Sequence, residues 1–295
     1  MSDEVLPEEL ISEILRHALH APPDVFLDPA HDRAWFARPD APPSPLAGSA
    51  LLRVSRRWRR IGTPLLFAAL WLSRAAHTRT VLRVLRESPA LGALVRDLRL
   101  DGGFVPELRD AVALMPGVRN VHLSWVAGKG HDTDGLWEVM PMLRPRRLWL
   151  GTADFVEEGR QELVRLMNLL ATCFVDSWDT LEFVHLIHWY PMLRVIADAL
   201  QHAPALKTMS VHAEDVYNWS WSADSLSFLD NPSLQTILCR TSENLRAARD
   251  FLEKRGVKKR ITDRLTLVSE GGPLQAASAP QQRPEVFEGM RMIRI

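Results

Sequence analysis

The sequence predicts an α/β protein in which N-terminal helices precede a solenoid of strand–helix repeats. Three observations predict it: an apolar-x-x-apolar-x-apolar motif recurs along the chain, the intervals between its copies have helical spacing of apolar residues, and residues 1–72 contain two amphipathic helical patterns. The chain has 295 residues, 46% of them hydrophobic and 24% charged. That length and composition are enough to bury a sizeable core.

Charge and cysteine usage narrow the class of protein. Lys+Arg and Asp+Glu both number 36, so the formal net charge is zero, which disfavours a dedicated nucleic-acid binder. The two cysteines, Cys173 and Cys239, lie in apolar stretches without CxxC spacing, which predicts buried thiols in a reducing compartment. The acidic N-terminus has no signal-peptide pattern, and no uncharged run is long enough for a membrane span. We therefore expect an intracellular protein, cytoplasmic or nuclear, with no membrane partner.

The first helix is expected in "LPEELISEILRHALH", where apolar residues recur at helical spacing after Pro7. Residues 20–49 hold seven of the 20 prolines, which predicts a long loop because proline interrupts helices and central strands. A second helix is expected from "LLRVSRRWRRIG" at residues 51–62. At 100° per residue, Val54 and Trp58 share its inward stripe, the arginines occupy its solvated face, and Leu52 points outward, which indicates a partner.

The recurring motif predicts strands at regular positions. Its fourth residue serves as a marker, and successive markers are 23 to 36 residues apart. The markers are Leu70, Leu98, Val121, Leu148, Val184, Met209, Ile237 and Leu265. The helical intervals are 78–94, 106–115, 159–174, 190–204 and 242–256. An L-x-x-L-x-L motif with a period of about 20–29 residues is typical of leucine-rich repeats, which stack into a horseshoe. The repeats are irregular, and we expect no asparagine ladder.

"LPEELISEIL", then "LLRVSRRWRRIGTPLLFAALWL", then irregular leucine-rich repeats together resemble the F-box proteins, closest to those numerous in mushroom-forming fungi. In that family a three-helix module docks on the Skp adaptor of a cullin–RING ubiquitin ligase, while the repeats hold the substrate. The resemblance implies that Leu6, Pro7, Leu10, Ile14, Leu52 and Val54 contact or shape the Skp surface. It also implies that Trp58 and Leu65 hold the helices together. Two features depart from the family: the Pro-rich insert, and Ser55 where the family often has Cys.

A target-binding surface is expected on the concave face of the repeat strands, where polar and aromatic residues alternate with the apolar positions. The candidates are Asn120, His122, Arg147, Trp149, Phe183, His185, Ser210, His212 and Arg240. A metal site formed by His122, His185 and His212 is disfavoured, because His122 and His185 are expected two strands apart and no carboxylate accompanies them. No catalytic motif stands out. We expect no metal, no cofactor and no catalysis.

The predicted organisation is an F-box-like domain at 1–72 with its insert at 20–49, an irregular leucine-rich-repeat solenoid at 73–270, and a tail at 271–295. The predicted function is that of a non-catalytic substrate receptor in a Skp–cullin–F-box ubiquitin ligase. Its partners would be the Skp-type adaptor, through it the cullin–RING ligase, and an unidentified target protein. The alternative is a leucine-rich-repeat interaction scaffold with no role in ubiquitin transfer.

Overall fold

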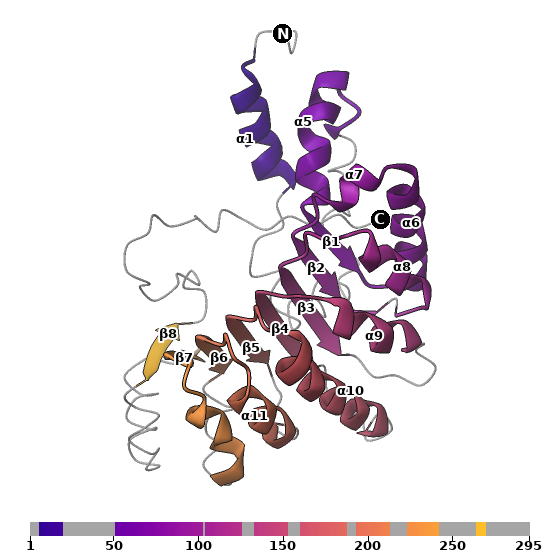
Figure 1. The fold of residues 1–295 in the computed structure, drawn as a ribbon. Helices are drawn as coiled ribbons and strands as arrows, with labels where there is room; N and C mark the ends of the chain where they lie inside the picture. Colours follow the sequence, from indigo (N-terminus) through magenta and orange to yellow (C-terminus); the bar gives the residue numbers. More distant parts are fainter. Residues whose placement is uncertain are drawn as a thin grey trace, which may run out of the picture. The chain divides into compact units, whose positions relative to one another are not determined.

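The computed structural model describes residues 6–19, 51–102, 104–125, 133–152, 160–187, 193–212, 223–241 and 264–269. The expected Pro-rich insert at 20–49, the helix at 242–256 and the tail at 271–295 lie outside these residues. The chain has a mixed α/β fold (Figure 1). The strands are β1 (Ala69–Leu72), β2 (Asp97–Leu100), β3 (Asn120–Trp125), β4 (Arg147–Thr152), β5 (Phe183–Ile187), β6 (Thr208–His212), β7 (Thr236–Thr241) and β8 (Leu265–Ser269).

Most helices lie between successive strands. The α-helices are α1 (Glu8–Leu19), α5 (Arg56–Phe67), α6 (Ala75–Glu87), α7 (Pro89–Gly92), α8 (Glu107–Ala113), α9 (Asp134–Val139), α10 (Arg160–Thr172) and α11 (Leu193–Gln201). The 3-10 helices η2 (Met140–Met142) and η6 (Ala223–Asp230) and the π-helix η4 (Cys173–Ser177) complete the described set. The expected intervals 78–94, 106–115, 159–174 and 190–204 are confirmed as helical, whereas α9 and η6 were not expected.

The strands form one sheet in chain order from β1 to β8. The strand pairs whose register is described are all parallel. Their register joins marker to marker: Leu70 pairs with Leu98, Leu148 with Val184, Val184 with Met209, Met209 with Ile237 and Ile237 with Leu265. At these five pairings each marker therefore lies opposite the next marker along the chain.

Contacts divide the chain into two units. The first comprises Met1–His122, Asp132–Leu136 and Val286–Ile295, and the second comprises Leu123–His131 and Trp137–Glu285. The first unit thus contains α1, α5 and the first strands, and the second contains β4 to β8.

The core is built from the apolar positions of the motif. The seven markers from Leu70 to Ile237 are 0% exposed, and the residues two positions after them, from Leu72 to Cys239, are at most 1% exposed. Since alternate residues of a strand point to opposite faces, these two rows share one sheet face. We call it the first sheet face. Helices accompany the strands within each unit (Figure 1), and the largest fully buried side chain, Trp178, donates its Nε1 hydrogen to Met140 O at 3.2 Å.

Candidate interaction surfaces

Helices α1 and α5 pack together around a small apolar core within the first unit. Ile11, Leu15 and Leu66 are buried there, and Leu6, Leu52, Trp58 and Leu65 pack against them, half-buried. Gly62 permits the close approach, because a Cβ at this position would lie 2.3 Å from Leu52 Cδ2 and 3.2 Å from Leu15 Cδ1. The expected contribution of Trp58 and Leu65 to holding the helices together agrees with this packing.

The start of α5 corrects two orientations expected from helical spacing. Ser55 has extended backbone and its Oγ accepts a hydrogen bond from Trp58 N at 3.2 Å, so Ser55 is the N-cap. Residues 51–54 form a turn before the helix, and a stripe of 100° per residue does not extend into it. As a result Leu52 packs inward on the core, while Val54 is 59% exposed. The expectation of an outward Leu52 and an inward Val54 was wrong.

The arginines of α5 are more than a solvated face. Glu8, in the first turn of α1, accepts a hydrogen bond from Arg60 Nη2, and its Oε1 lies 3.6 Å from Arg57 Nε. The carboxylate therefore joins the two helices through two guanidinium groups. Because these groups are partly exposed, the ion pairs contribute orientation more than stability.

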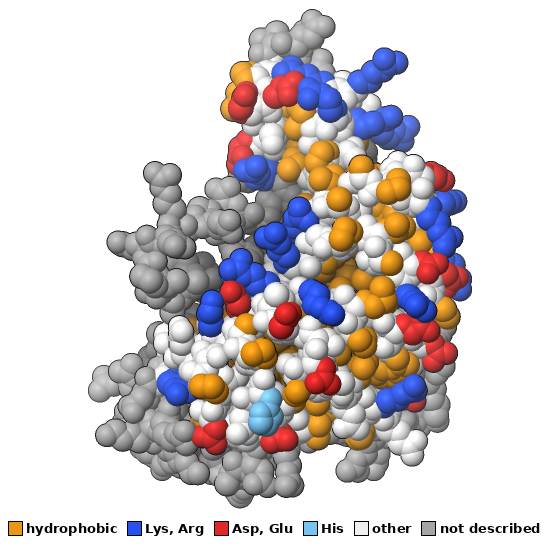
Figure 2. Space-filling model, viewed as in Figure 1, with side chains coloured by type: hydrophobic (Ala, Val, Ile, Leu, Met, Phe, Trp, Pro, Cys, Tyr) orange, Lys and Arg blue, Asp and Glu red, His pale blue; other side chains and the backbone are white. Residues whose placement is uncertain are grey.

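Large apolar side chains remain exposed on this helix pair. Leu10 is 50%, Ile14 43% and Val54 59% exposed, and we call these three residues the N-terminal apolar patch. Figure 2 shows hydrophobic side chains at the surface of α1 and α5 beside acidic and basic ones. Of the other residues expected at an adaptor surface, Pro7 is exposed and Leu6 is half-buried.

The opposite side of the strands, which we call the second sheet face, departs from expectation. Four residues expected to be exposed there, His122, Trp149, His185 and Ser210, are at most 2% exposed. Alternation along a strand fixes which face a side chain joins, but not whether that face is open. These four residues therefore cannot contact a partner without rearrangement of the chain. Asn120, Arg147, Phe183 and Arg240 are half-buried, and the side chain of His212, at the end of β6, lies outside the described part.

In the first unit this face carries a buried ion-pair cluster that the sequence analysis missed. Asp101 Oδ2 accepts hydrogen bonds from Trp71 Nε1 at 2.5 Å and from Arg99 Nε at 2.7 Å. The guanidinium carbon of Arg99 lies 4.7 Å from the centroid of the Trp71 ring, so a cation–π contact closes the cluster. Arg99 is 0% exposed. Beside it, Asn120 Nδ2 donates to Asp97 Oδ1 at 2.6 Å.

In the second unit, Trp149, His185 and Ser210 lie side by side on β4, β5 and β6 in the parallel register. Trp149 Nε1 and Ser210 Oγ are buried and have no hydrogen-bond partner. The Trp149 ring contacts Phe183, with centroids 5.5 Å apart. Buried polar atoms are usually hydrogen-bonded, and these two unpaired atoms lie on β4 and β6, on either side of β5.

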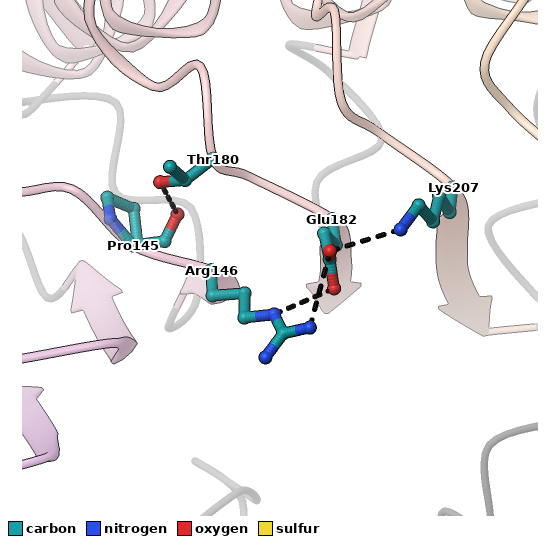
Figure 3. A network of polar contacts seen from close by, with 5 residues as sticks. All are labelled: Pro145, Arg146, Thr180, Glu182 and Lys207. Carbon is teal, nitrogen blue, oxygen red and sulfur yellow. Dashed lines mark hydrogen bonds and ion pairs between the residues drawn. The ribbon is translucent and has the colours of Figure 1, made fainter. Parts of the chain in front are cut away.

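The residues immediately before these strands form a second polar group (Figure 3). Glu182 accepts hydrogen bonds from Arg146 Nε at 2.8 Å and from Lys207 Nζ at 3.1 Å, so one carboxylate bridges three consecutive strands. Partial burial raises the pKa of Glu182, but the hydrogen bonds from Arg146 and Lys207 outweigh it and hold the pKa below its usual value. Thr180 Oγ1 also donates to Pro145 O at 3.3 Å. These contacts link the residues that precede β4, β5 and β6.

The described residues include two free thiols, but no metal-binding group and no membrane-spanning helix. Among the residues that the structure describes, no group of three His, Cys, Asp or Glu side chains is placed to hold a metal ion. Both cysteines are buried free thiols, as predicted, and burial raises the pKa of Cys173 to about 12. Within the same described ranges, no helix is both long and apolar enough to cross a bilayer.

Comparisons of the chain with protein-family models, with curated proteins and with solved structures gave no match.

Proposed function

We propose that this chain is a non-catalytic substrate receptor of a Skp–cullin–F-box ubiquitin ligase. In this proposal α1 and α5 form the F-box-like module, and the strands and helices that follow belong to an irregular leucine-rich-repeat solenoid that presents a target protein. The marker-to-marker register supports the repeat assignment, because each strand then enters the sheet at the same repeat position.

The N-terminal apolar patch carries the proposal. Three of the seven exposed large hydrophobic side chains of the described residues, Leu10, Ile14 and Val54, belong to this one helix pair. Exposure of an apolar side chain to water is unfavourable in free energy, and burial against a partner surface removes this penalty. Leu10 and Ile14 are four residues apart on α1 and therefore share one helix face. All three lie at positions for which the F-box resemblance implies adaptor contact.

The proposal is tested by co-purification of the full chain with a Skp-type adaptor. Leu10→Asp combined with Ile14→Asp should abolish capture while leaving the fold intact, because both side chains are already exposed. Val164→Asp and Val175→Asp are matched controls, since Val164 is 40% and Val175 48% exposed in the second unit. These controls should retain capture. No adaptor capture by the wild-type chain would reject the receptor and favour a repeat scaffold without a ligase role.

A further inference from the structure

The residue two positions before each marker lies where a strand is about to begin, and we call this repeat position the strand-start position. In the second unit it is linked from strand to strand by the backbone. Glu182 N donates to Arg146 O at 2.9 Å, and Lys207 N donates to Glu182 O at 3.0 Å. In the first unit Arg119 N donates to Arg96 O at 2.9 Å. Successive strand-start positions therefore have the same backbone arrangement in both units.

The side chains at the strand-start position differ between the units. In the second unit the Glu182 carboxylate lies between two cations, 2.8 Å from Arg146 Nε and 3.1 Å from Lys207 Nζ (Figure 3). In the first unit both successive residues, Arg96 and Arg119, are exposed arginines. Among the residues that the structure describes, neither arginine has a carboxylate within ion-pair distance. The first unit thus places two like charges at neighbouring strand starts without the counter-charge that the second unit contains.

The guanidinium of Arg96 is held in place by the backbone. Its Nη1 donates to Ala93 O at 3.0 Å and to Gly117 O at 3.2 Å. Gly117 permits this approach, because a Cβ at that position would overlap with Arg96 Nη1. These bonds occupy one nitrogen of the guanidinium and leave the Nε and Nη2 hydrogens for an acceptor. Since the side chain is already ordered, less conformational freedom is lost when an anion binds to it.

We propose that Arg96 and Arg119 together bind a carboxylate from an acidic segment of a target protein. The second unit shows the chemistry, because there one carboxylate, that of Glu182, binds cations on both neighbouring strands. Guanidinium groups are well suited to the acceptor, since their planar N–H groups match the geometry of a carboxylate. Charge complementarity favours a negatively charged partner at this edge. This inference deepens the proposed function, on which it rests only in making the segment part of a ubiquitylation target.

The test is fluorescence anisotropy of the full chain with a fluorescein-labelled Glu-Ser repeat peptide and its Gln-for-Glu counterpart. The Glu peptide should bind more tightly, and its affinity should fall as salt rises. Arg119→Glu should weaken binding of the Glu peptide about tenfold, because it removes one cation and gives Arg96 an internal carboxylate. The variant recreates the pair of Arg146 and Glu182, so its urea midpoint should not fall. Unfolding then cannot account for the lost binding.

Two further variants make the test specific. Arg83→Glu is the matched charge control, because Arg83 is an exposed arginine of α6 in the same unit but not at a strand-start position. It should change the affinity much less than Arg119→Glu does. Arg96→Lys keeps the charge but loses the planar guanidinium, and it should weaken binding about fivefold.

Three outcomes would each overturn the proposal. They are equal affinity for the Glu and Gln peptides, an unchanged affinity in Arg119→Glu, and an equal loss of affinity in Arg83→Glu. Tighter binding of a fluorescein-labelled oligothymidylate would overturn it as well, because the partner would then be a nucleic acid. The assay contains no adaptor, so its failure leaves the co-purification test of the receptor proposal unaffected.

Discussion

The cluster of Trp71, Arg99 and Asp101 provides a quantitative test of how burial controls an ion pair. Asp101→Ala removes the acceptor of two hydrogen bonds and the counter-charge of a guanidinium that is 0% exposed. Removing one partner of a buried ion pair costs about 3–5 kcal/mol of unfolding free energy, because the remaining charge stays buried and loses that counter-charge. The expected result is a lower urea midpoint with an unchanged m-value. Unfolding is measured by circular dichroism at fixed pH.

A surface pair of the same length is the control. Arg86 Nη2 lies 2.7 Å from Asp110 Oδ2, the same distance as between Arg99 Nε and Asp101, but its side chains are 61% and 56% exposed. Asp110→Ala should therefore cost about 0–1 kcal/mol. Arg99→Met combined with Asp101→Ala should be less destabilised than Asp101→Ala alone, because no charge is then left buried. Equal shifts for Asp101→Ala and Asp110→Ala, or a double variant as unstable as the sum of the singles, would refute the reasoning.

Three further predictions use single substitutions. Gly62→Ala should cost about 1–3 kcal/mol by forcing Leu52 aside, and Leu52→Ala should make Gly62→Ala milder in a double-variant denaturation series. Asn231→Ala should cost about 3 kcal/mol in urea unfolding, because the 1% exposed Asn231 side chain donates to two backbone carbonyls and accepts from Ser233 N. Glu182, whose pKa is lowered in the fold, stabilises the native state above its usual pKa of 4.5, and this stability is lost as pH falls through the lowered value. The Glu182→Gln variant should therefore lose less stability than wild type as pH falls from neutral to the lowered pKa of Glu182. Urea midpoints of variant and wild type that fall in parallel with pH would contradict this prediction.

The spacing of the markers was sufficient to predict where the strands lie, for a physical reason. A strand–helix unit cannot bury its apolar face alone, so corresponding positions of successive units must stack. Residues at the same distance from their markers therefore pair across neighbouring strands. Leu70 pairs with Leu98, and Val184 pairs with Met209. The polar bridge of Arg146, Glu182 and Lys207 was predictable by the same rule, since each residue precedes its marker by two positions.

Helical spacing failed where a cap interrupts it. The positions of Leu52 and Val54 depend on where α5 begins, and that is decided by the hydrogen bond from Trp58 N to Ser55 Oγ. A serine just before a run with helical spacing, here three residues before Trp58, is a recognisable N-cap signal. Applying it would have ended the stripe at residue 56 and left Val54 free to face solvent. The exposed large apolar residues of the N-terminal apolar patch are therefore Leu10, Ile14 and Val54, while Leu52 packs against the core of Ile11, Leu15 and Leu66.

The burial of the second sheet face follows from no local pattern, because alternation assigns a face and cannot say what lies over it. What the sequence does contain is a difference between copies of the motif. Trp71 and Trp149 both follow a marker directly, yet Asp101 accepts the indole hydrogen of Trp71, whereas Trp149 Nε1 has no hydrogen-bond partner. The markers and the residues two positions after them are buried in strand after strand, whereas the polar groups on the opposite face differ. The burial of Trp149 and Arg99 therefore had to be read from the structure, because the same alternating pattern would also fit an open face.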